Sequence, residues 1–385
     1  MMRRRLAYLC LETPHEGQGA STHVREIVRG LLASGWQVEL FATGCGGASA
    51  GTWYLARVVD YVRVQWALYR ALRRFDAIYV RAHFAALPLA LVARRRAVPV
   101  FQEVNGSPAD LGVTYRWLRP FLGALTWSYR VQLRHASHVF AVTSGLVEWV
   151  CRTVRHTRVT LVSNAADTEL FHPDGPVAPI GGRYVIFVGG LVAWHGIATM
   201  LAATHSPRWP RDVRLVVVGD GIERARVEAA AQDGSTVLWL GRRSYEEVPE
   251  LLRGAVAALC VIDDPDGRSA TGVAPLKLFE ALACGLPVIA SDLPFQADIV
   301  RSHGLGIVVP AGSSVALASA VATLATRPED ARAMGRRGAA YARAHASWSA
   351  RAGETCSIMA RTLDGTDSRR ARARGEMKEG IGNRE

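Results

Sequence analysis

The chain has 385 residues, of which 49% are apolar and 21% charged, and its formal net charge is +12. Domains usually hold about 100–200 residues, so this length predicts two domains rather than a single core. No apolar run approaches the roughly 20 residues of a membrane-spanning helix. The six cysteines are scattered without a Cys-x-x-Cys pair, which argues against a zinc or redox motif.

Short apolar runs alternate with helical patterns in the first part of the chain. Strands are predicted at residues 6–11, 38–42, 77–80, 98–103 and 138–142, helices at 21–34 and 87–95, and a long amphipathic segment at 54–74. The apolar stretch after the first arginines is too short for a signal peptide, so we interpret it as a buried strand and expect a cytoplasmic protein. Strands that alternate with helices predict parallel pairing with right-handed crossovers.

The same pattern restarts after residues 164–182, which are rich in Pro, Gly and Asp and form the predicted linker. Strands follow at 184–188, 214–218, 237–240, 257–261, 288–290 and 307–309, and helices at 196–203, 223–231, 245–253, 276–283, 314–326 and 331–344. The predicted fold is therefore α/β, with two Rossmann-like, doubly wound parallel-sheet domains at 1–172 and 183–345. Ligands of such sheets lie beyond the carboxyl ends of the strands, which places the site in a central cleft between the domains.

The last residues predict two further features. A helix at 346–364 is expected to cross back to the first domain. Residues 365–385 are rich in Arg, Gly, Glu and Lys without periodicity, so we expect a disordered tail.

The strongest motif for chemistry is segment 272–291, Gly-Val-Ala-Pro-Leu-Lys-Leu-Phe-Glu-Ala-Leu-Ala-Cys-Gly-Leu-Pro-Val-Ile-Ala-Ser. It predicts a loop, a helix that stops at Gly285, and a buried strand. The amino end of a helix has free amides and a partial positive charge, which suits a diphosphate. Lys277 would add a cation there, and Glu280 would accept hydrogen bonds from a ribose diol. A plain structural helix with an exposed glutamate is the alternative.

This segment resembles the nucleotide-binding element of the family 4 glycosyltransferases, which are retaining enzymes of the GT-B fold. In that family the final Glu of an E-x7-E motif holds the ribose. Glu280 matches it, and the resemblance places Lys277 and Leu278 beside the donor. The first Glu of the motif is replaced by Gly272, so the family's contact to the donor sugar through that carboxylate is absent. A branch with a Pro-Leu-Lys-Leu-Phe-Glu signature shows this departure.

A second block, residues 187–196, resembles the family's Val-Gly-Arg-Leu strand and loop followed by Lys-Gly. The family's Arg and Lys contact the donor phosphates, and here those positions hold Gly190 and His195. We expect a partly protonated His195, together with the lysine of the first block, to replace the lost charge, because a diphosphate favours the imidazolium. A packed loop histidine is the alternative. The predicted donor site also includes Gly189, Trp194, Gly196 and, after the strand at 214–218, Gly219.

Two matches lie in the first half of the chain. Residues 17–26 resemble the family's Gly-Gly-x-x-x-His-Val loop, which brings Gly19 to the donor, although a Rossmann phosphate loop could look similar. After the strand at 98–103, Asn105 stands where family members often carry a histidine close to the transferred sugar, with Glu103 nearby. Asn105, His195 and Lys277 are the predicted catalytic residues.

No metal or other cofactor is expected. The run Asp263-Asp264-Pro265-Asp266 could be a metal-binding D-x-D, but that motif belongs to a one-sheet fold, so we interpret it as a solvated acidic loop.

The resemblance implies transfer of a sugar from a UDP- or GDP-sugar to a glycan or lipid-linked glycan with retention of configuration, in exopolysaccharide or surface-glycan biosynthesis. An epimerase or phosphorylase of the same fold, or a catalytically decayed scaffold, remains as the alternative.

The basic residues suggest a membrane partner. Residues 1–175 hold 21 arginines, no lysine and 12 acidic residues, with Trp53, Trp66, Trp117 and Trp127 near basic patches. This excess favours an anionic surface at the inner face of the cell membrane, and we expect no nucleic acid as a partner. Solvated arginine-rich helix faces are the alternative.

Overall fold

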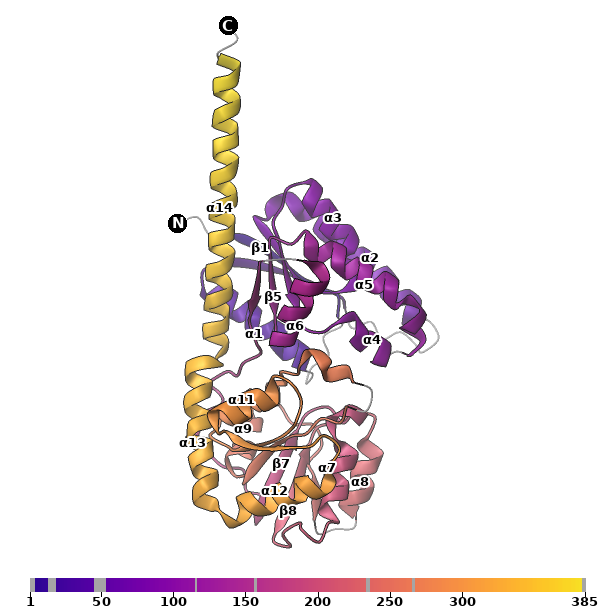
Figure 1. The fold of residues 1–385 in the computed structure, drawn as a ribbon, viewed down its shortest axis with the longest axis vertical. Helices are drawn as coiled ribbons and strands as arrows, with labels where there is room; N and C mark the ends of the chain where they lie inside the picture. The colour runs from indigo at the N-terminus through magenta and orange to yellow at the C-terminus, as the bar shows by residue number, and fades with distance from the viewer. Residues whose placement is uncertain are drawn as a thin grey trace.

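The computed structural model describes residues 4–12, 19–44, 53–114, 116–155, 158–232, 236–264 and 267–382. They form two lobes, one above the other in Figure 1, each built on a six-stranded sheet. Lobe 1 comprises β1 to β6 with α1 to α6, and lobe 2 comprises β7 to β12 with α7 to α13. The predicted α/β fold with two doubly wound parallel sheets is confirmed.

The lobe 1 sheet has the strand order β2-β1-β3-β4-β5-β6, and every neighbouring pair is parallel. Its strands are β1 (Arg5–Cys10), β2 (Gln37–Ala42), β3 (Ala77–Arg81), β4 (Val100–Val104), β5 (His138–Ala141) and β6 (Val159–Leu161). Its helices are α1 (Gly19–Ala33), α2 (Trp53–Ala71), α3 (Leu87–Arg95), α4 (Pro108–Thr114), α5 (Leu122–Arg134) and α6 (Ser144–Trp149). The strand order reverses between β1 and β3, so this lobe's topological switch point lies there.

The lobe 2 sheet has the order β12-β11-β10-β7-β8-β9, again with parallel neighbours. Its strands are β7 (Arg183–Val188), β8 (Val213–Val218), β9 (Val237–Trp239), β10 (Ala257–Cys260), β11 (Val288–Ser291) and β12 (Gly306–Val309). Its helices are α7 (Ile197–Thr204), α8 (Arg224–Gln232), α9 (Val248–Arg253), α10 (Leu276–Ala283), α11 (Gln296–His303), α12 (Ser314–Thr326) and α13 (Pro328–His345). Its switch point lies between β7 and β10.

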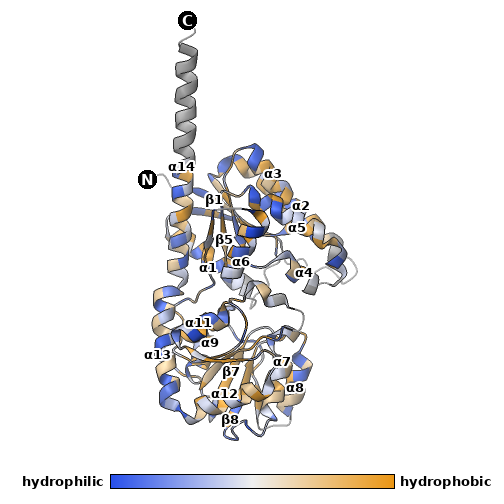
Figure 2. Cartoon of the chain, in the orientation of Figure 1, coloured by the Kyte–Doolittle hydropathy of each residue, from blue (hydrophilic) through white to orange (hydrophobic). Residues whose placement is uncertain are grey.

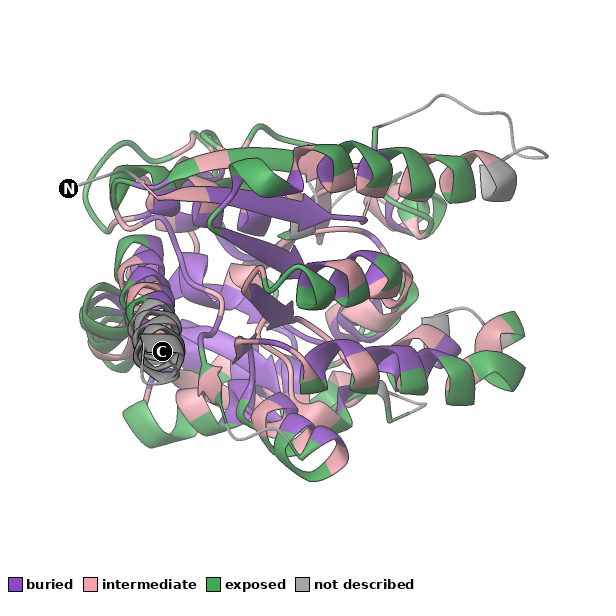
Figure 3. Cartoon of the chain, turned by 90° about the horizontal axis from the view of Figure 1, so that it is seen from above, coloured by how far each residue is buried: buried purple, intermediate pink, exposed green. Residues whose placement is uncertain are grey.

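Helices cover both faces of each sheet, so the strands are apolar along most of their length. The hydrophobic colour follows most strands of both lobes in Figure 2, and most strands are buried in Figure 3, whereas the edge strands β2 and β6 are partly exposed. Four helices and one strand were not predicted from the sequence: α4, α5, α6, α11 and β6.

The chain crosses between the lobes twice, and the two crossings pair with each other. The Ala166 amide donates to the Ala346 carbonyl at 2.9 Å, and the Trp348 amide donates to the Ala166 carbonyl at 3.1 Å. From there α14 (Trp348–Gly382) runs along lobe 1 (Figure 1). A Cβ at Gly30 of α1 would lie 2.2 Å from the Ala352 Cβ, so this glycine permits the two helices to pack closely. The helix continues through residues 365–382, where the sequence predicted a disordered tail.

Candidate functional site

Helix α10 begins at the interface with lobe 1. Pro275 precedes its first residue, Leu276, and no side chain caps the helix. A Cβ at Gly19 of lobe 1 would lie 3.3 Å from the Leu276 Cδ1, so this glycine lies directly against the start of α10. The amino end of α10 therefore faces the other lobe, and its first amides have no partner within the helix. Gly17 and Gln18 of the predicted loop lie outside the described residues.

The loop that leads into α10 is bonded to lobe 1 at two points. The Thr143 hydroxyl donates to the Thr271 carbonyl at 2.5 Å. The Asn164 side-chain nitrogen donates to the Ala274 carbonyl at 2.6 Å. Lobe 1 thus fixes the position of the loop and, through it, the start of α10.

Lys277 places a buried ammonium at the switch point of lobe 2. Its Nζ lies 3.8 Å from the centre of the Phe187 ring, on β7, and 3.0 Å from where a Cβ on Gly189 would be. Within the described part of the chain, Nζ has no hydrogen-bond partner. Burial lowers the Lys277 pKa to about 8, against the opposing charges of Cys260 and Glu280. Compared with an ordinary value of 10.5, burial disfavours this cation by roughly 3 kcal/mol.

His195 lies on the other side of the same loop. It ends the short turn Ala193–His195, and its Nδ1 donates to the Gly190 carbonyl at 2.7 Å. Its ring centre is 6.1 Å from that of Phe187. The structure therefore brings His195, Lys277, Gly189 and Gly190 together around one aromatic ring, while a catalytic role of His195 stays a prediction.

The remaining predicted donor residues of this region have packing roles. Gly219 has φ +138°, and a Cβ there would lie 1.9 Å from the Gly189 carbonyl oxygen. Gly196 has φ +65°, and its Cβ would lie 2.6 Å from Val261. The Trp194 carbonyl accepts from the amide of Asp263 at 3.0 Å. These contacts explain the glycines by backbone approach, and contact with a donor stays a prediction.

Leu278 packs in the core of lobe 2. Its side chain is fully buried in the lobe 2 core, and its amide donates to the Pro275 carbonyl at 3.1 Å. These contacts give Leu278 a packing role, and its contact with a donor stays a prediction.

Glu280 is buried rather than exposed, which removes the alternative of a solvent-facing glutamate. Burial raises its pKa to about 7; Tyr245 and Lys277 partly oppose this, and Glu26 of lobe 1 adds to it. The Arg25 guanidinium, also from lobe 1, lies 4.9 Å from the centre of the Tyr245 ring. Side chains of both lobes therefore surround the predicted ribose carboxylate.

Gly272, where the family motif has its first glutamate, has a backbone suited to glycine. Its φ is +87°, and a Cβ would lie 3.1 Å from the Phe295 Cβ and 3.3 Å from the Thr143 Cβ. An L-residue would be strained there and would press on lobe 1. The position that lacks the carboxylate therefore has a backbone conformation that favours glycine.

In lobe 1 a buried network surrounds Glu103 at the end of β4. The carboxylate accepts from the Tyr79 hydroxyl at 2.7 Å, Arg81 Nη1 at 3.0 Å and Asn105 Nδ2 at 2.5 Å. His23 Nε2 lies 2.8 Å away. Burial alone would raise the Glu103 pKa, but the charge of His23, with Arg81 and the Asn105 amide, holds it well below its usual range.

The Asn105 side-chain nitrogen is therefore bonded to Glu103, and a catalytic role of Asn105 stays a prediction. The network also contains functional candidates that sequence reasoning missed, Arg81 and His23. Both have a sequence signal: Arg81 follows a predicted strand at the switch-point edge, and His23 belongs to the matched loop.

The aspartates of the acidic run at 263–266 that the structure describes make hydrogen bonds to nearby residues. Asp263 accepts from the Thr199 hydroxyl at 2.9 Å, and Asp264 accepts from the Ser269 amide at 3.0 Å. Pro265 and Asp266 lie outside the described residues. Within the described ranges, no group of three or more His, Cys, Asp or Glu side chains could hold a metal ion.

Two doubly wound parallel sheets in two lobes, with the start of α10 packed against lobe 1, are the architecture of the two-lobed, GT-B glycosyltransferases. Comparison with known proteins agrees. The model described as "Glycosyltransferase Family 4" matches residues 17–170, and "Glycosyl transferases group 1" matches residues 173–341. The chain belongs to this family 4 group of GT-B glycosyltransferases.

Characterised relatives carry different names. The chain is 28% identical to the "Alpha-maltose-1-phosphate synthase" of Mycolicibacterium smegmatis, over 60% of this chain and 65% of that protein. It is 32% identical to the "GDP-mannose-dependent alpha-mannosyltransferase" of Mycobacterium tuberculosis, over 63% of each. The matches span slightly less than two thirds of these relatives. A sucrose-phosphate synthase structure from Thermosynechococcus elongatus superimposes with a TM-score of 0.77 at 19% identity, covering 94% of this chain and 100% of that one, which supports the fold alone.

Proposed function

We propose that this glycosyltransferase moves a sugar from a UDP- or GDP-sugar to a glycan or lipid-linked glycan, with retention of configuration, in exopolysaccharide or surface-glycan biosynthesis. The observation that carries the proposal is the buried Lys277 ammonium in the first turn of α10, which lies over the Phe187 ring and has no hydrogen-bond partner among the described residues. A donor diphosphate placed there would pair with the cation and accept bonds from the first amides of the helix.

The same geometry suits departure of a nucleoside diphosphate. Negative charge develops on the leaving phosphate as the glycosidic bond breaks, and donors fixed in advance stabilise that charge without reorganising. Lys277 and the α10 amides would supply such donors without a metal ion, with His195 at the neighbouring loop. Glu280, one turn along α10, would hold the ribose, and closure of the lobes would keep water from the donor.

The test begins with calorimetry of UDP and GDP binding, followed by a screen of nucleotide sugars for turnover. The proposal expects one of the two nucleotides to bind and a sugar of that nucleotide to be consumed. A scaffold would bind neither. An epimerase would convert the donor with no acceptor present, and a phosphorylase would require free phosphate, so each rival has its own outcome.

We also propose that lobe 1 docks on an anionic membrane surface through α2. This helix exposes Val58, Val59, Val62 and Trp66 to between 57% and 63%. Arginines surround this face: Arg63 and Arg70 on α2, and Arg73 and Arg74 just after it. An apolar strip flanked by arginines suits a helix that lies in the interface of an anionic bilayer.

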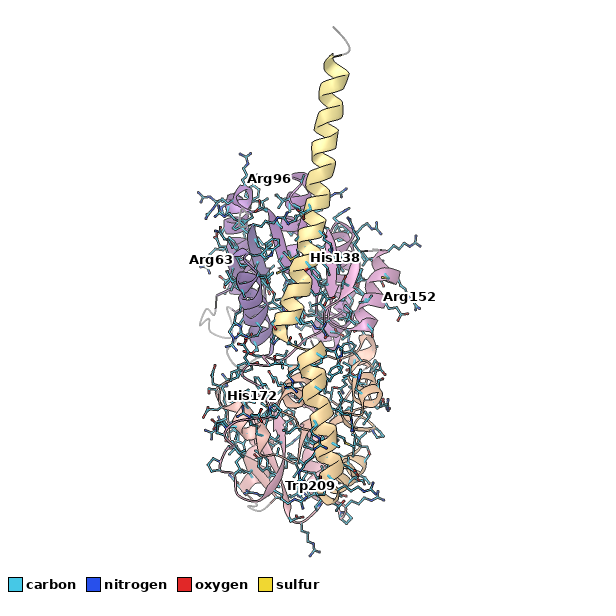
Figure 4. All side chains as sticks on the ribbon, turned by 90° about the vertical axis from the view of Figure 1, so that its left-hand side faces the viewer. Arg63, Arg96, His138, Arg152, His172 and Trp209 are labelled. Atoms are coloured by element: carbon cyan, nitrogen blue, oxygen red, sulfur yellow. The ribbon has the colours of Figure 1, made fainter. Side chains whose placement is uncertain are left out.

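The position of the basic residues agrees with this surface. Arg63 and Arg96 lie on the same side of lobe 1 in Figure 4, with Arg152 on the other side. A surface depression of about 340 Å³ there is lined by Arg73 and Arg96 with Phe75. The Trp53 side chain is not among those described. Among the described residues, no helix combines the length and apolarity needed to cross a bilayer.

Flotation with vesicles of anionic or neutral lipid tests the surface. Binding to anionic vesicles should fall in a Val62→Ser/Trp66→Ser variant and at high salt. Ile222→Ser, which changes an exposed apolar residue of lobe 2, is the matched control and should bind like the wild type. No binding of the wild type at low salt would contradict the proposal.

A further inference from the structure

His23 of α1 is buried, and each of its ring nitrogens lies close to a polar side chain. Its Nδ1 is 2.7 Å from the Asn164 Oδ1, and its Nε2 is 2.8 Å from the Glu103 Oε1. The Asn164 nitrogen in turn donates to the Ala274 carbonyl of lobe 2. These contacts form one continuous chain from Glu103 in lobe 1 to the loop before α10.

The direction of each bond in this chain is fixed by chemistry. A backbone carbonyl can only accept, so the Asn164 nitrogen must face Ala274 and its oxygen must face His23. Nδ1 of His23 therefore carries a proton. Nε2 lies at ion-pair distance from the Glu103 carboxylate, but it makes no hydrogen bond to it. His23 therefore donates through Nδ1 to Asn164 and lies with its other ring nitrogen against the Glu103 carboxylate.

Both ends of the chain lead to predicted functional residues. Ala274 is followed by Pro275, whose ring restricts the backbone, and then by the first turn of α10 with Lys277. A shift of the Ala274 carbonyl would therefore move the cation. At the other end, the Glu103 carboxylate holds the Asn105 amide.

The same histidine contacts the crossing between the lobes. The Trp348 ring meets the His23 ring edge-on, with 5.1 Å between ring centres. Trp348 is where α14 begins, and its amide bonds to Ala166 of the other crossing. His23 thus touches the hinge region, the lobe 1 network and, through Asn164, the donor loop.

We propose that His23 is a positioning residue, which aligns the donor helix of lobe 2 with the Glu103–Asn105 pair of lobe 1 when the lobes are closed. This inference rests on the proposed function. His23 does not contact the donor or acceptor itself. It acts by holding Asn164 on the Ala274 carbonyl, which sets the distance between Lys277 and Asn105.

Variants can separate the two arms of the imidazole. His23→Phe keeps the packing on Trp348 but removes both polar contacts. His23→Asn keeps a donor near the Nδ1 position, and His23→Gln keeps one near Nε2. Asn164→Ala breaks only the link to Ala274. Thr143→Val is the matched control. It removes the other hydrogen bond between lobe 1 and the loop before α10, but Thr143 is not part of the series of contacts from Glu103 through His23 and Asn164 to Ala274.

The assay measures kcat and KM for the donor, the affinity for its nucleotide, and the share of donor lost to hydrolysis rather than transfer. His23→Phe and Asn164→Ala should each lower kcat roughly 10–100-fold, because small misplacements of reacting groups have effects of that size. Nucleotide affinity should stay within about threefold, hydrolysis should gain on transfer, and the double variant should be no worse than either single one. His23→Asn should recover more activity than His23→Gln, since it keeps the arm to Asn164.

Several results would overturn the proposal. One is an equal loss of kcat in Thr143→Val, and another is additive losses in the double variant. A third is a fall in nucleotide affinity as large as the fall in kcat. Hydrogen exchange on the ligand-free protein adds a readout that needs no activity: amides of 274–280 should exchange faster in His23→Phe than in wild type. If wild type binds no nucleotide, the proposed function fails, while unchanged exchange in the variant refutes the positioning chain by itself.

Discussion

Nucleotide binding should change the protonation of Lys277, and a Lys277→Met variant isolates that change. Burial holds the pKa of the ammonium at about 8 in the free protein. A diphosphate beside it would raise that pKa, because an adjacent anion favours the charged form. A group with this pKa is half protonated at pH 8, so binding should take up about half a proton per site there. In Lys277→Met this uptake should disappear.

Glu280 should contribute a proton change of the opposite sign at lower pH. Burial raises its pKa to about 7, so it is half protonated at pH 7. Ribose hydroxyls that donate to the carboxylate favour its ionised form, and binding should release about half a proton there. Wild type should therefore release protons on binding at pH 7 and take them up at pH 8.

Calorimetry in pairs of buffers with different ionisation enthalpies measures these protons. The phosphate groups of the nucleotide also titrate, but their second pKa is about 6, so at pH 8 they are ionised in the free nucleotide and differences from wild type report the side chain. Lys277→Arg carries a permanent cation, so it should also show no proton uptake from residue 277. It replaces Lys277→Met in the experiment if the methionine variant binds nucleotide too weakly to measure. Equal proton uptake by wild type and either variant at pH 8, with binding intact, would refute contact between Lys277 and the diphosphate.

Four other outcomes follow from the same geometry. Glu280→Ala should weaken nucleotide affinity by more than about tenfold, whereas Lys277→Ala should mainly lower turnover. Calorimetry measures the affinity and steady-state kinetics the turnover. Unchanged nucleotide affinity in Glu280→Ala would exclude the ribose assignment. Gly272→Glu should destabilise lobe 2 by about 1–3 kcal/mol in urea unfolding and should not raise activity, while Gly312→Ala, at φ +74° with no neighbour within 4 Å, shows the cost of the backbone conformation alone. The folded state holds the Glu280 proton to higher pH than the unfolded chain, so stability is lost as pH rises from about 4.5 to about 7, and Glu280→Gln should flatten melting temperature over that window. Lys277→Met should stabilise the ligand-free protein by about 1–3 kcal/mol, because it replaces a buried ion that has no hydrogen-bond partner among the described residues by an apolar group. A lower melting temperature would contradict the buried cation.

The sequence predicted the elements whose apolar residues have one clear period. All strands except β6 were predicted in this way, and so was helix α10, because apolar side chains cover one continuous face or run. Helix α5 was missed because its inward face is partly polar. Ser128 and Gln132 are buried there and bond to the Phe84 carbonyl, so the apolar period is interrupted.

Site residues that lie close together in the sequence could be predicted, whereas contacts between residues from distant parts of the sequence could not. Lys277 and Glu280 lie on one helix, so their spacing alone places them one turn apart. The partners of Glu103 come from β3 and α1, and the bond from Asn164 to Ala274 joins residues 110 positions apart. Spacing carries no information on such contacts. The strained φ of +72° at Phe295, beside Gly272, is equally invisible in the sequence.

The two lobes treat buried charge in opposite ways, and this contrast argues against a catalytically decayed scaffold. In lobe 1 the Glu103 carboxylate has four close partners, whereas in lobe 2 the Lys277 ammonium has no hydrogen-bond partner within the described residues. Burying an unpaired ion costs several kcal/mol, and a chain that binds no anion would be more stable with a methionine or leucine in that place. The glycines at 190 and 272 remove charges that the family pattern would supply, yet the remaining cation and the helix amides still face the lobe interface together. A bound diphosphate would offset the free-energy cost of burying that cation. A glycosyltransferase needs such a cation to bind its donor, and a scaffold does not.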